Sequence, residues 1–253
     1  MTVFQRIVKY CAVGFAVYLV IVIVGGLLAG VGGLSFLSDR FGDREASDAG
    51  KIYEVGQDIG EIEIELAAAD CEILTGDRFS VESSSSALKV KSFNGRLEIT
   101  DSVGSINDGV RLKLYIPSDA QLKRIDISAG AGDIYAERLA CSSLSLECGA
   151  GDVEIAEAVA TVKAEIDGGV GEITVSAGSM NDLELDMGIG SLRLTNRLRG
   201  VCDLDFGIGD ADITLIGTAE DYALNYDAGD GLKTRVNIDK GIGTVNIVYA
   251  EAG

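Results

Sequence analysis

Acidic residues recur at one position of a repeated motif, and they are the side chains of this chain best placed to do chemistry. Each follows a glycine-x-glycine unit, and the units start 19 or 20 residues apart, which gives Asp133, Asp152, Glu172 and Asp210, with Ser191 at the fourth of five positions. Stacked in register, these carboxylates would form an oxygen ladder of the kind that Ca²⁺ prefers. The alternative is that short acids accept hydrogen bonds from turn N–H groups. Repulsion between neighbours about 4.8 Å apart in water is only about 1 kcal/mol, so the ladder needs no metal and we predict none.

The composition excludes most familiar catalytic sites. The 253 residues contain no histidine, which removes Ser-His-Asp and Cys-His pairs and His-ligated zinc. The glycine units are not nucleotide loops, because no G-x-G-x-x-G or GKS/GKT motif follows a strand and opens a helix. A glycan lyase on a β-helix is the remaining enzymatic alternative, with three arginines near two acids: Arg193, Arg197, Arg199, Asp186 and Asp203. Arginines at solvated edges explain that cluster equally well, so we predict no catalytic residue and no cofactor.

The charge balance argues against nucleic acid as a partner. The chain has 21 Lys and Arg against 40 Asp and Glu, a formal net charge of −19. Phosphate binding depends on clustered cations, and this excess of carboxylates repels a polyanion.

The glycine units belong to a repeat that predicts the fold. Their first glycines are Gly130, Gly149, Gly169, Gly188 and Gly207, and the flanking residues alternate apolar and polar as in a strand. One unit of about 19 residues cannot bury its apolar face alone, whereas stacked units share a continuous core. We therefore predict an all-β fold, a single-stranded, right-handed-type parallel β-solenoid with G-x-G corners.

Several details follow from this register. The middle corner residues are apolar, so we expect them to point inward: Ala131, Ala150, Val170, Ile189 and Ile208. Cys148 and Cys202 are expected inward as free thiols. Two further corners, at residues 229–231 and 241–243, come at shifted spacings, so we expect an irregular C-terminal cap. Residues 51–118 alternate without the clean period and are expected to pack on, or coil into, the same solenoid.

The N-terminal segment predicts a membrane anchor. Residues 10–37 carry no charge and are mostly apolar, and about 20 such residues span a bilayer. Arg6 and Lys9 precede them, which places residues 1–9 in the cytoplasm and the rest outside. Residues 38–50 are a polar linker, and residues 51–253 form the extracytoplasmic solenoid. A cleavable signal peptide is the alternative, but the apolar run exceeds the usual h-region of about 7–15 residues and no clear A-x-A site follows.

These features resemble the putative adhesin family of bacterial surface proteins, the DUF4097 type. The resemblance rests on Ile116-Pro117-Ser118-Asp119, the strand from Leu122 to Ile127, and the Gly-x-Gly-Asp-Ile/Val units from Gly130 onward, and it covers roughly residues 52–250. It implies a single N-terminal membrane helix and, in some relatives, a place beside envelope-stress regulators. It supplies no catalytic residues.

The combined expectation is a membrane-anchored, non-catalytic surface protein that presents an acidic solenoid to a protein or glycan. One alternative is a regulatory partner of a membrane sensor in an envelope-stress system. Another is a structural protein that polymerises end to end.

Overall fold

The computed structural model describes residues 51–85, 88–101, 110–224 and 234–251, and every regular element within them is a strand. The predicted cytoplasmic tail, membrane helix and linker, at residues 1–9, 10–37 and 38–50, lie outside this part. No helix long and apolar enough to cross a membrane occurs among the residues described.

Fifteen strands make up the described part, and they form one continuous sheet. Their bounds are β1 Lys51–Glu54, β2 Glu61–Gly76, β3 Ser80–Ser83, β4 Leu88–Phe93, β5 Arg96–Asp101, β6 Val110–Pro117, β7 Leu122–Ala131, β8 Ile134–Ala150, β9 Val153–Val175, β10 Gly178–Asn181, β11 Leu183–Arg199, β12 Val201–Ile216, β13 Tyr222–Leu224, β14 Thr234–Ile242 and β15 Val245–Ala250.

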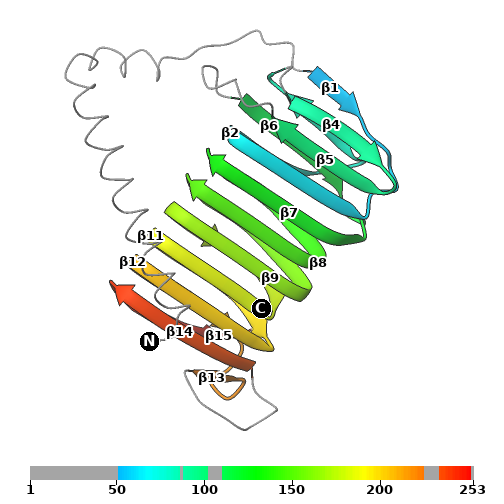
Figure 1. Cartoon of the computed structure of the whole chain (residues 1–253). Helices are drawn as coiled ribbons and strands as arrows, with labels where there is room; N and C mark the ends of the chain where they lie inside the picture. The colour runs from blue at the N-terminus through cyan, green and yellow to red at the C-terminus, as the bar shows by residue number, and fades with distance from the viewer. Residues whose placement is uncertain (1–50, 86–87, 102–109, 225–233, 252–253) are drawn as a thin grey trace, which may run out of the picture. The chain divides into compact units, whose positions relative to one another are not determined.

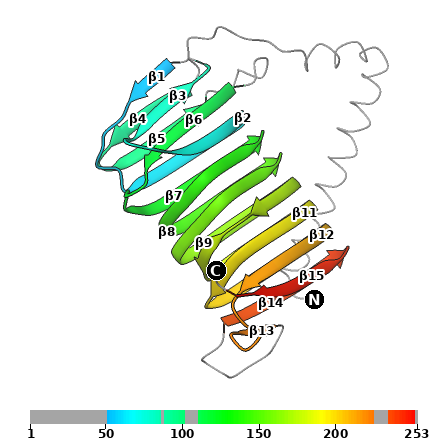
Figure 2. The same cartoon turned by 180° about the vertical axis from the view of Figure 1, so that it is seen from behind.

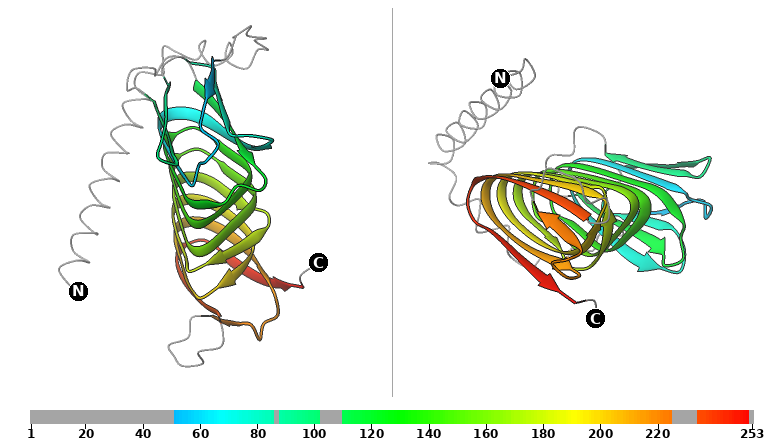
Figure 3. Two further views of the ribbon diagram at one scale, coloured as in Figure 1. Left: turned by 90° about the vertical axis from the view of Figure 1, so that its right-hand side faces the viewer. Right: turned by 90° about the horizontal axis from the view of Figure 1, so that it is seen from below.

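The long strands stack in parallel, as the repeat predicts. Strands β2, β7, β8, β9, β11, β12 and β14 lie side by side along one face, as Figures 1 and 2 show. The pairing keeps equivalent repeat positions together, so that Ala150 pairs with Val170, Val170 with Ile189, and Ile189 with Ile208. Seen end on, each coil closes around an interior (Figure 3, right). The all-β parallel stack is therefore confirmed, and its handedness stays a prediction.

Alternating side chains fill the interior. One column of inward positions runs through Ile134, Val153, Ile173, Leu192 and Ala211, and each of these residues is at most 2% exposed. Cys148 and Cys202 point inward as expected, and Cys71 and Cys141 are also buried and free. Burial raises the pKa of the Cys71 thiol to about 12, so it is an inert part of the core.

The N-terminal region differs from a pure parallel stack. Strand β2 is a full coil, parallel to β5, β6 and β7. Three other pairs are antiparallel: β1 with β3, β3 with β6, and β4 with β5. The first coil is thus closed off by short antiparallel strands, which explains why the 19-residue period is missing before residue 118.

The prediction for the corner residues was wrong. Ala131 and Ala150 are exposed, and Val170, Ile189 and Ile208 are 40%, 45% and 50% exposed. Four residues separate the inward Cys148 from the inward Val153, which interrupts strict alternation. The middle corner residue therefore lies on the convex side, facing solvent.

The prediction of an irregular C-terminal cap was also wrong where the structure describes it. Strand β14 resumes the parallel register 34 residues after β12, with Asp205 opposite Asp239 and Ile208 opposite Ile242. The corner at residues 241–243 is therefore one more regular coil, reached after an insertion. The corner at residues 229–231 lies outside the described residues.

Candidate binding groove

The predicted acidic ladder forms, and its oxygens are engaged by the backbone. Asp133 Oδ1 accepts the Asp152 N–H at 2.9 Å, and Asp152 Oδ1 accepts the Glu172 N–H at 2.8 Å. Asp210 Oδ1 accepts the Thr244 N–H at 2.8 Å. Each carboxylate satisfies the amide at the same position of the next coil, where the corner interrupts the strand ladder. We call Asp133, Asp152 and Asp210 the capping acids.

Glu172 and its neighbours are engaged in a different way. Glu172 forms an ion pair with Arg193 and accepts a hydrogen bond from Ser191 at 3.3 Å. Within the described ranges, no three His, Cys, Asp or Glu side chains lie close enough to hold a metal ion. Arg193 is thus engaged by Glu172, and no ion pair there joins it to Asp186 or Asp203.

Two rows of glycines shape the corner. A Cβ on Gly149 would lie 2.5 Å from the Gly130 carbonyl oxygen. A Cβ on Gly209 would overlap the carbonyl oxygen of Gly190. Gly209 also has φ 149°, in the region that side chains disfavour. The glycines let adjacent coils approach closely and leave a strip without side chains along the solenoid.

That strip is the floor of a groove of about 630 Å³. Its apolar lining includes Cys148, Met187 and Phe206. One rim carries an acid from each of five coils, and we call them the groove acids: Glu147, Asp167, Asp186, Asp205 and Asp239. Their backbones pair in register from coil to coil. Neighbouring strands lie about 4.8 Å apart, so the groove acids form a continuous line of negative charge.

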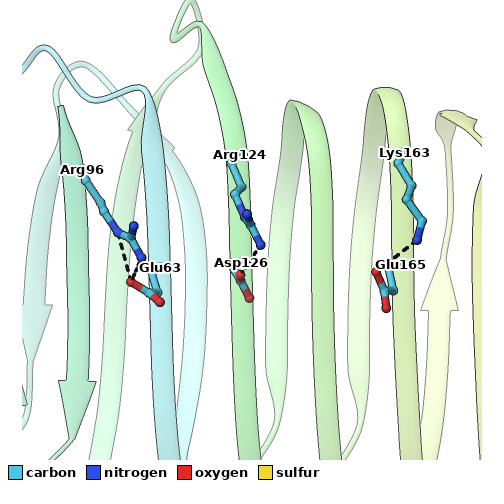
Figure 4. A network of polar contacts seen from close by, with 6 residues as sticks. All are labelled: Glu63, Arg96, Arg124, Asp126, Lys163 and Glu165. Atoms are coloured by element: carbon cyan, nitrogen blue, oxygen red, sulfur yellow. Dashed lines mark hydrogen bonds and ion pairs between the residues drawn. The ribbon is translucent and has the colours of Figure 1, made fainter.

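The groove acids form no ion pair in the described part of the chain, although Lys240 lines the groove and the charge of Lys163 lowers the pKa of Asp167. The acids two residues earlier on the strands do form ion pairs. Glu63 pairs with Arg96, Asp126 with Arg124 at 3.0 Å, and Glu165 with Lys163 at 3.3 Å (Figure 4). Lys163 also reaches Glu184 at 2.9 Å. No ion pair among the described residues includes a groove acid, so one row is partly neutralised and the other is open.

The electrostatic cost of this row shows in its pKa values. Burial raises the pKa of Asp167, Asp186 and Asp205 above the ordinary 3.8, and neighbouring carboxylates raise it further. For Asp205 the largest charge effects come from Asp186 and Asp239, its neighbours in the row. A bound cation would relieve this repulsion.

An exposed apolar row lies next to the groove, just beyond its glycine floor. Val170, Ile189, Ile208 and Ile242 stand in register on successive coils and are 40% to 72% exposed, and we call them the corner ridge. Each ridge residue follows directly after a glycine of the floor and stands three residues after a groove acid, so an acidic row and an aliphatic row run in parallel.

The sequence carries a signal for this site. Every groove acid stands two residues before the first glycine of its corner, with the same spacing as the capping acids. Only the structure separates the two rows, because only it shows which carboxylates meet a backbone amide.

Comparison with known proteins agrees with this architecture. The model of the Toastrack DUF4097 family matches residues 59–239. The chain belongs to this family. The comparison with curated proteins finds no match.

The solved structures that match this chain are distant in sequence. The Toastrack chain is 13% identical to a "putative adhesin" from Bacteroides fragilis, over 79% of this chain and 96% of that one, with a TM-score of 0.42. It is 15% identical to a "putative cell adhesion protein" from Clostridium sporogenes, over 79% and 99%, with a TM-score of 0.42. A "putative lipid binding protein" from Parabacteroides distasonis is 13% identical, over 78% and 96%, with a TM-score of 0.33.

Proposed function

We propose that this Toastrack chain is a non-catalytic binding protein whose groove holds a cationic, amphipathic segment of a partner protein. Residues 10–37 would anchor it in the cell membrane, with residues 1–9 in the cytoplasm and residues 51–253 outside. The observation that carries the proposal is the row of groove acids, which form no ion pairs among the described residues and lie beside the corner ridge.

The two rows suit a segment with two kinds of side chain. Lys or Arg side chains placed over Asp186 and Asp205 would neutralise carboxylates whose pKa values are already raised by burial and by neighbouring carboxylates. Apolar side chains on the same segment would cover Ile189 and Ile208, which are about half exposed. A glycan is the less favoured ligand, because the exposed ridge is aliphatic and Phe206, the aromatic residue of the groove lining, is partly buried.

A second copy of the chain does not suit this groove. It would bring a second line of the same carboxylates, and like charges placed opposite each other disfavour association. The partner is therefore expected to be a different molecule with positive charge.

The test is in-cell cross-linking of the tagged full-length chain, followed by mass spectrometry of the captured molecules. Three versions are compared: the wild type, the groove variant Asp186→Asn/Asp205→Asn, and the control variant Glu154→Gln/Glu220→Gln. Both variants remove two negative charges, and Glu154 and Glu220 are exposed residues outside the groove lining. The proposal expects one basic protein to be captured by the wild type and the control, and to be depleted with the groove variant.

The other outcomes separate the alternatives. Capture of one membrane sensor would assign the regulatory role within an envelope-stress system, whereas capture of wall fragments or surface glycans would favour a glycan ligand. Equal capture by all three versions would overturn the groove as the binding site. Filaments of the purified chain in electron microscopy would favour the polymerising alternative.

A further inference from the structure

The last strand of the solenoid has an unusual outer edge. Strand β15 reads Val-Asn-Ile-Val-Tyr-Ala and contains no charged residue, in a chain of net charge −19. It pairs in parallel with β12, from Ala211 opposite Val245 to Ile216 opposite Ala250. Among the residues that the structure describes, no strand pairs with its other edge. Figure 3 shows β15 at the C-terminal end of the stack.

Proteins usually protect such edges with charged residues, proline, bulges or short strands. The opposite end of this solenoid follows that rule: β1 carries Lys51 and Glu54, and β4 carries Lys89 and Lys91. At the C-terminal end, β13 pairs with the beginning of β14, at Thr234–Val236. Strand β15 has none of these protections, and its composition favours β pairing.

The core is also left open beside β15. On β12 the inward residues Ala211, Ile213 and Leu215 are at most 1% exposed. Their counterparts one coil later are Val245 and Ile247, which are only partly buried, and Tyr249, which is 39% exposed. One more strand, paired with the outer edge of β15, would bury these three side chains in the way that β15 buries the inward residues of β12.

We propose that this layer is the β15 strand of a second copy, paired antiparallel about a two-fold axis at Ile247. The partner's inward residues must face the same interior, which requires an even register. Centring on Ile247 satisfies this condition and pairs all residues from Val245 to Tyr249. Ile247 then meets the partner's Ile247, and Val245 meets the partner's Tyr249.

The chemistry of the pairing favours a second copy over a strand of another protein. Each inward pair joins β-branched or aromatic side chains, which stabilise antiparallel pairs. The outward pair, Asn246 with the partner's Val248, is neutral. The edge strands therefore bring no like charges together, unlike the rims of the acidic groove. The contact is isologous, and the charged antiparallel strands at the other end prevent further growth, so it closes as a dimer.

The dimer has a definite polarity. Strands β1 and β15 lie at opposite ends of the stack (Figure 1), so pairing through β15 places the two β1 ends far apart.

The first test measures the oligomeric state of the purified full-length chain in detergent by light scattering and sedimentation. We expect a dimer, and we expect Val248→Lys to raise its Kd by about tenfold or more, because it places on both paired strands the side chain that natural edge strands use to prevent pairing. Val162→Lys is the matched control, since Val162 is 58% exposed and Val248 is 54% exposed. It should leave the Kd unchanged. A monomeric wild type, or equal effects of both substitutions, would overturn the proposal.

A second test does not depend on the lysine variant folding. Antiparallel partners lie about 4.5–5.5 Å apart at Cα, which is within disulfide reach. In a Cys11→Ser background, Ile247→Cys should give a cross-linked dimer under mild oxidation, and Val162→Cys should not. A dimer that forms without cross-linking through residue 247 would contradict this pairing and assign the contact to another surface.

Discussion

The two rows of acids on either side of the glycine corner have the same spacing and different roles. The capping acids Asp133, Asp152 and Asp210 each accept a backbone amide of the next coil. The groove acids Asp167, Asp186 and Asp205 face a groove, without ion pairs in the described structure and with raised pKa values. One row therefore stabilises the solenoid, and the other destabilises it.

This difference indicates where to look for function on a repetitive surface. A carboxylate that satisfies an orphan amide is explained by folding alone. A line of carboxylates that repel one another is not, and it lies beside an exposed aliphatic ridge. The four predictions that follow test this comparison, from the largest expected effect to the smallest.

The glycine rows separate the two acid rows, so their loss should have the largest effect. In Gly209→Ala the new Cβ would overlap the Gly190 carbonyl oxygen at a φ of 149°. We expect destabilisation of about 4 kcal/mol or more, or failure to fold, measured by chemical unfolding. A loss below about 1 kcal/mol would mean that the coils can separate at this corner.

Loss of a capping acid should cost stability at neutral pH. Asp152→Ala removes the acceptor of the Glu172 N–H and leaves that amide to water. We expect the free energy of unfolding to fall by about 1 kcal/mol. Unchanged stability would show that the capping acids are also available for binding, and the distinction between the rows would fail.

Loss of groove acids should have the opposite sign. Asp186 and Asp205 have raised folded-state pKa values, so each carboxylate costs stability when the pH is above its folded pKa. Asp186→Asn/Asp205→Asn should therefore stabilise the protein near pH 7, by no more than about 1 kcal/mol because solvent screens these groups.

The gain should depend on pH in a defined way. As the pH falls through the raised pKa values, the folded wild type takes up protons and the gain shrinks. Below the ordinary value of 3.8 it should vanish, since both states are then protonated. Thermal unfolding of the two proteins from pH 7 to pH 3.5 measures this. A variant less stable than the wild type at pH 7 would contradict the assignment.

The smallest effect is expected at the corner ridge. Ile208 is 50% exposed, so Ile208→Asp should change the free energy of unfolding by no more than about 0.5 kcal/mol. The same substitution should weaken partner binding. Loss of folding would restore the inward orientation that the repeat pattern predicted.

The sequence predicted the parallel stack, because the 19-residue spacing and apolar alternation are set by the coils themselves. It predicted the wrong direction for Ile189 and Ile208, since aliphatic side chains normally go inward and the glycine corner interrupts the alternation. It predicted a ladder at Asp133 and Asp152 and offered backbone N–H groups as what those acids bind, but it did not predict that each amide belongs to the next coil. That amide lies 19 or 20 residues away, and its place depends on the register.

The most direct test of the account compares binding by the two acid rows in one titration. A synthetic peptide of alternating Lys and Leu is titrated by calorimetry into the full-length wild type, the groove variant Asp186→Asn/Asp205→Asn and the control variant Glu154→Gln/Glu220→Gln, with a Glu-Leu peptide as the reversed-charge probe. The account predicts that the wild type and the control bind the Lys-Leu peptide alike and that the groove variant binds it at least about tenfold more weakly. Equal weakening in both variants would mean that net charge alone attracts the peptide, and the groove would not be the site.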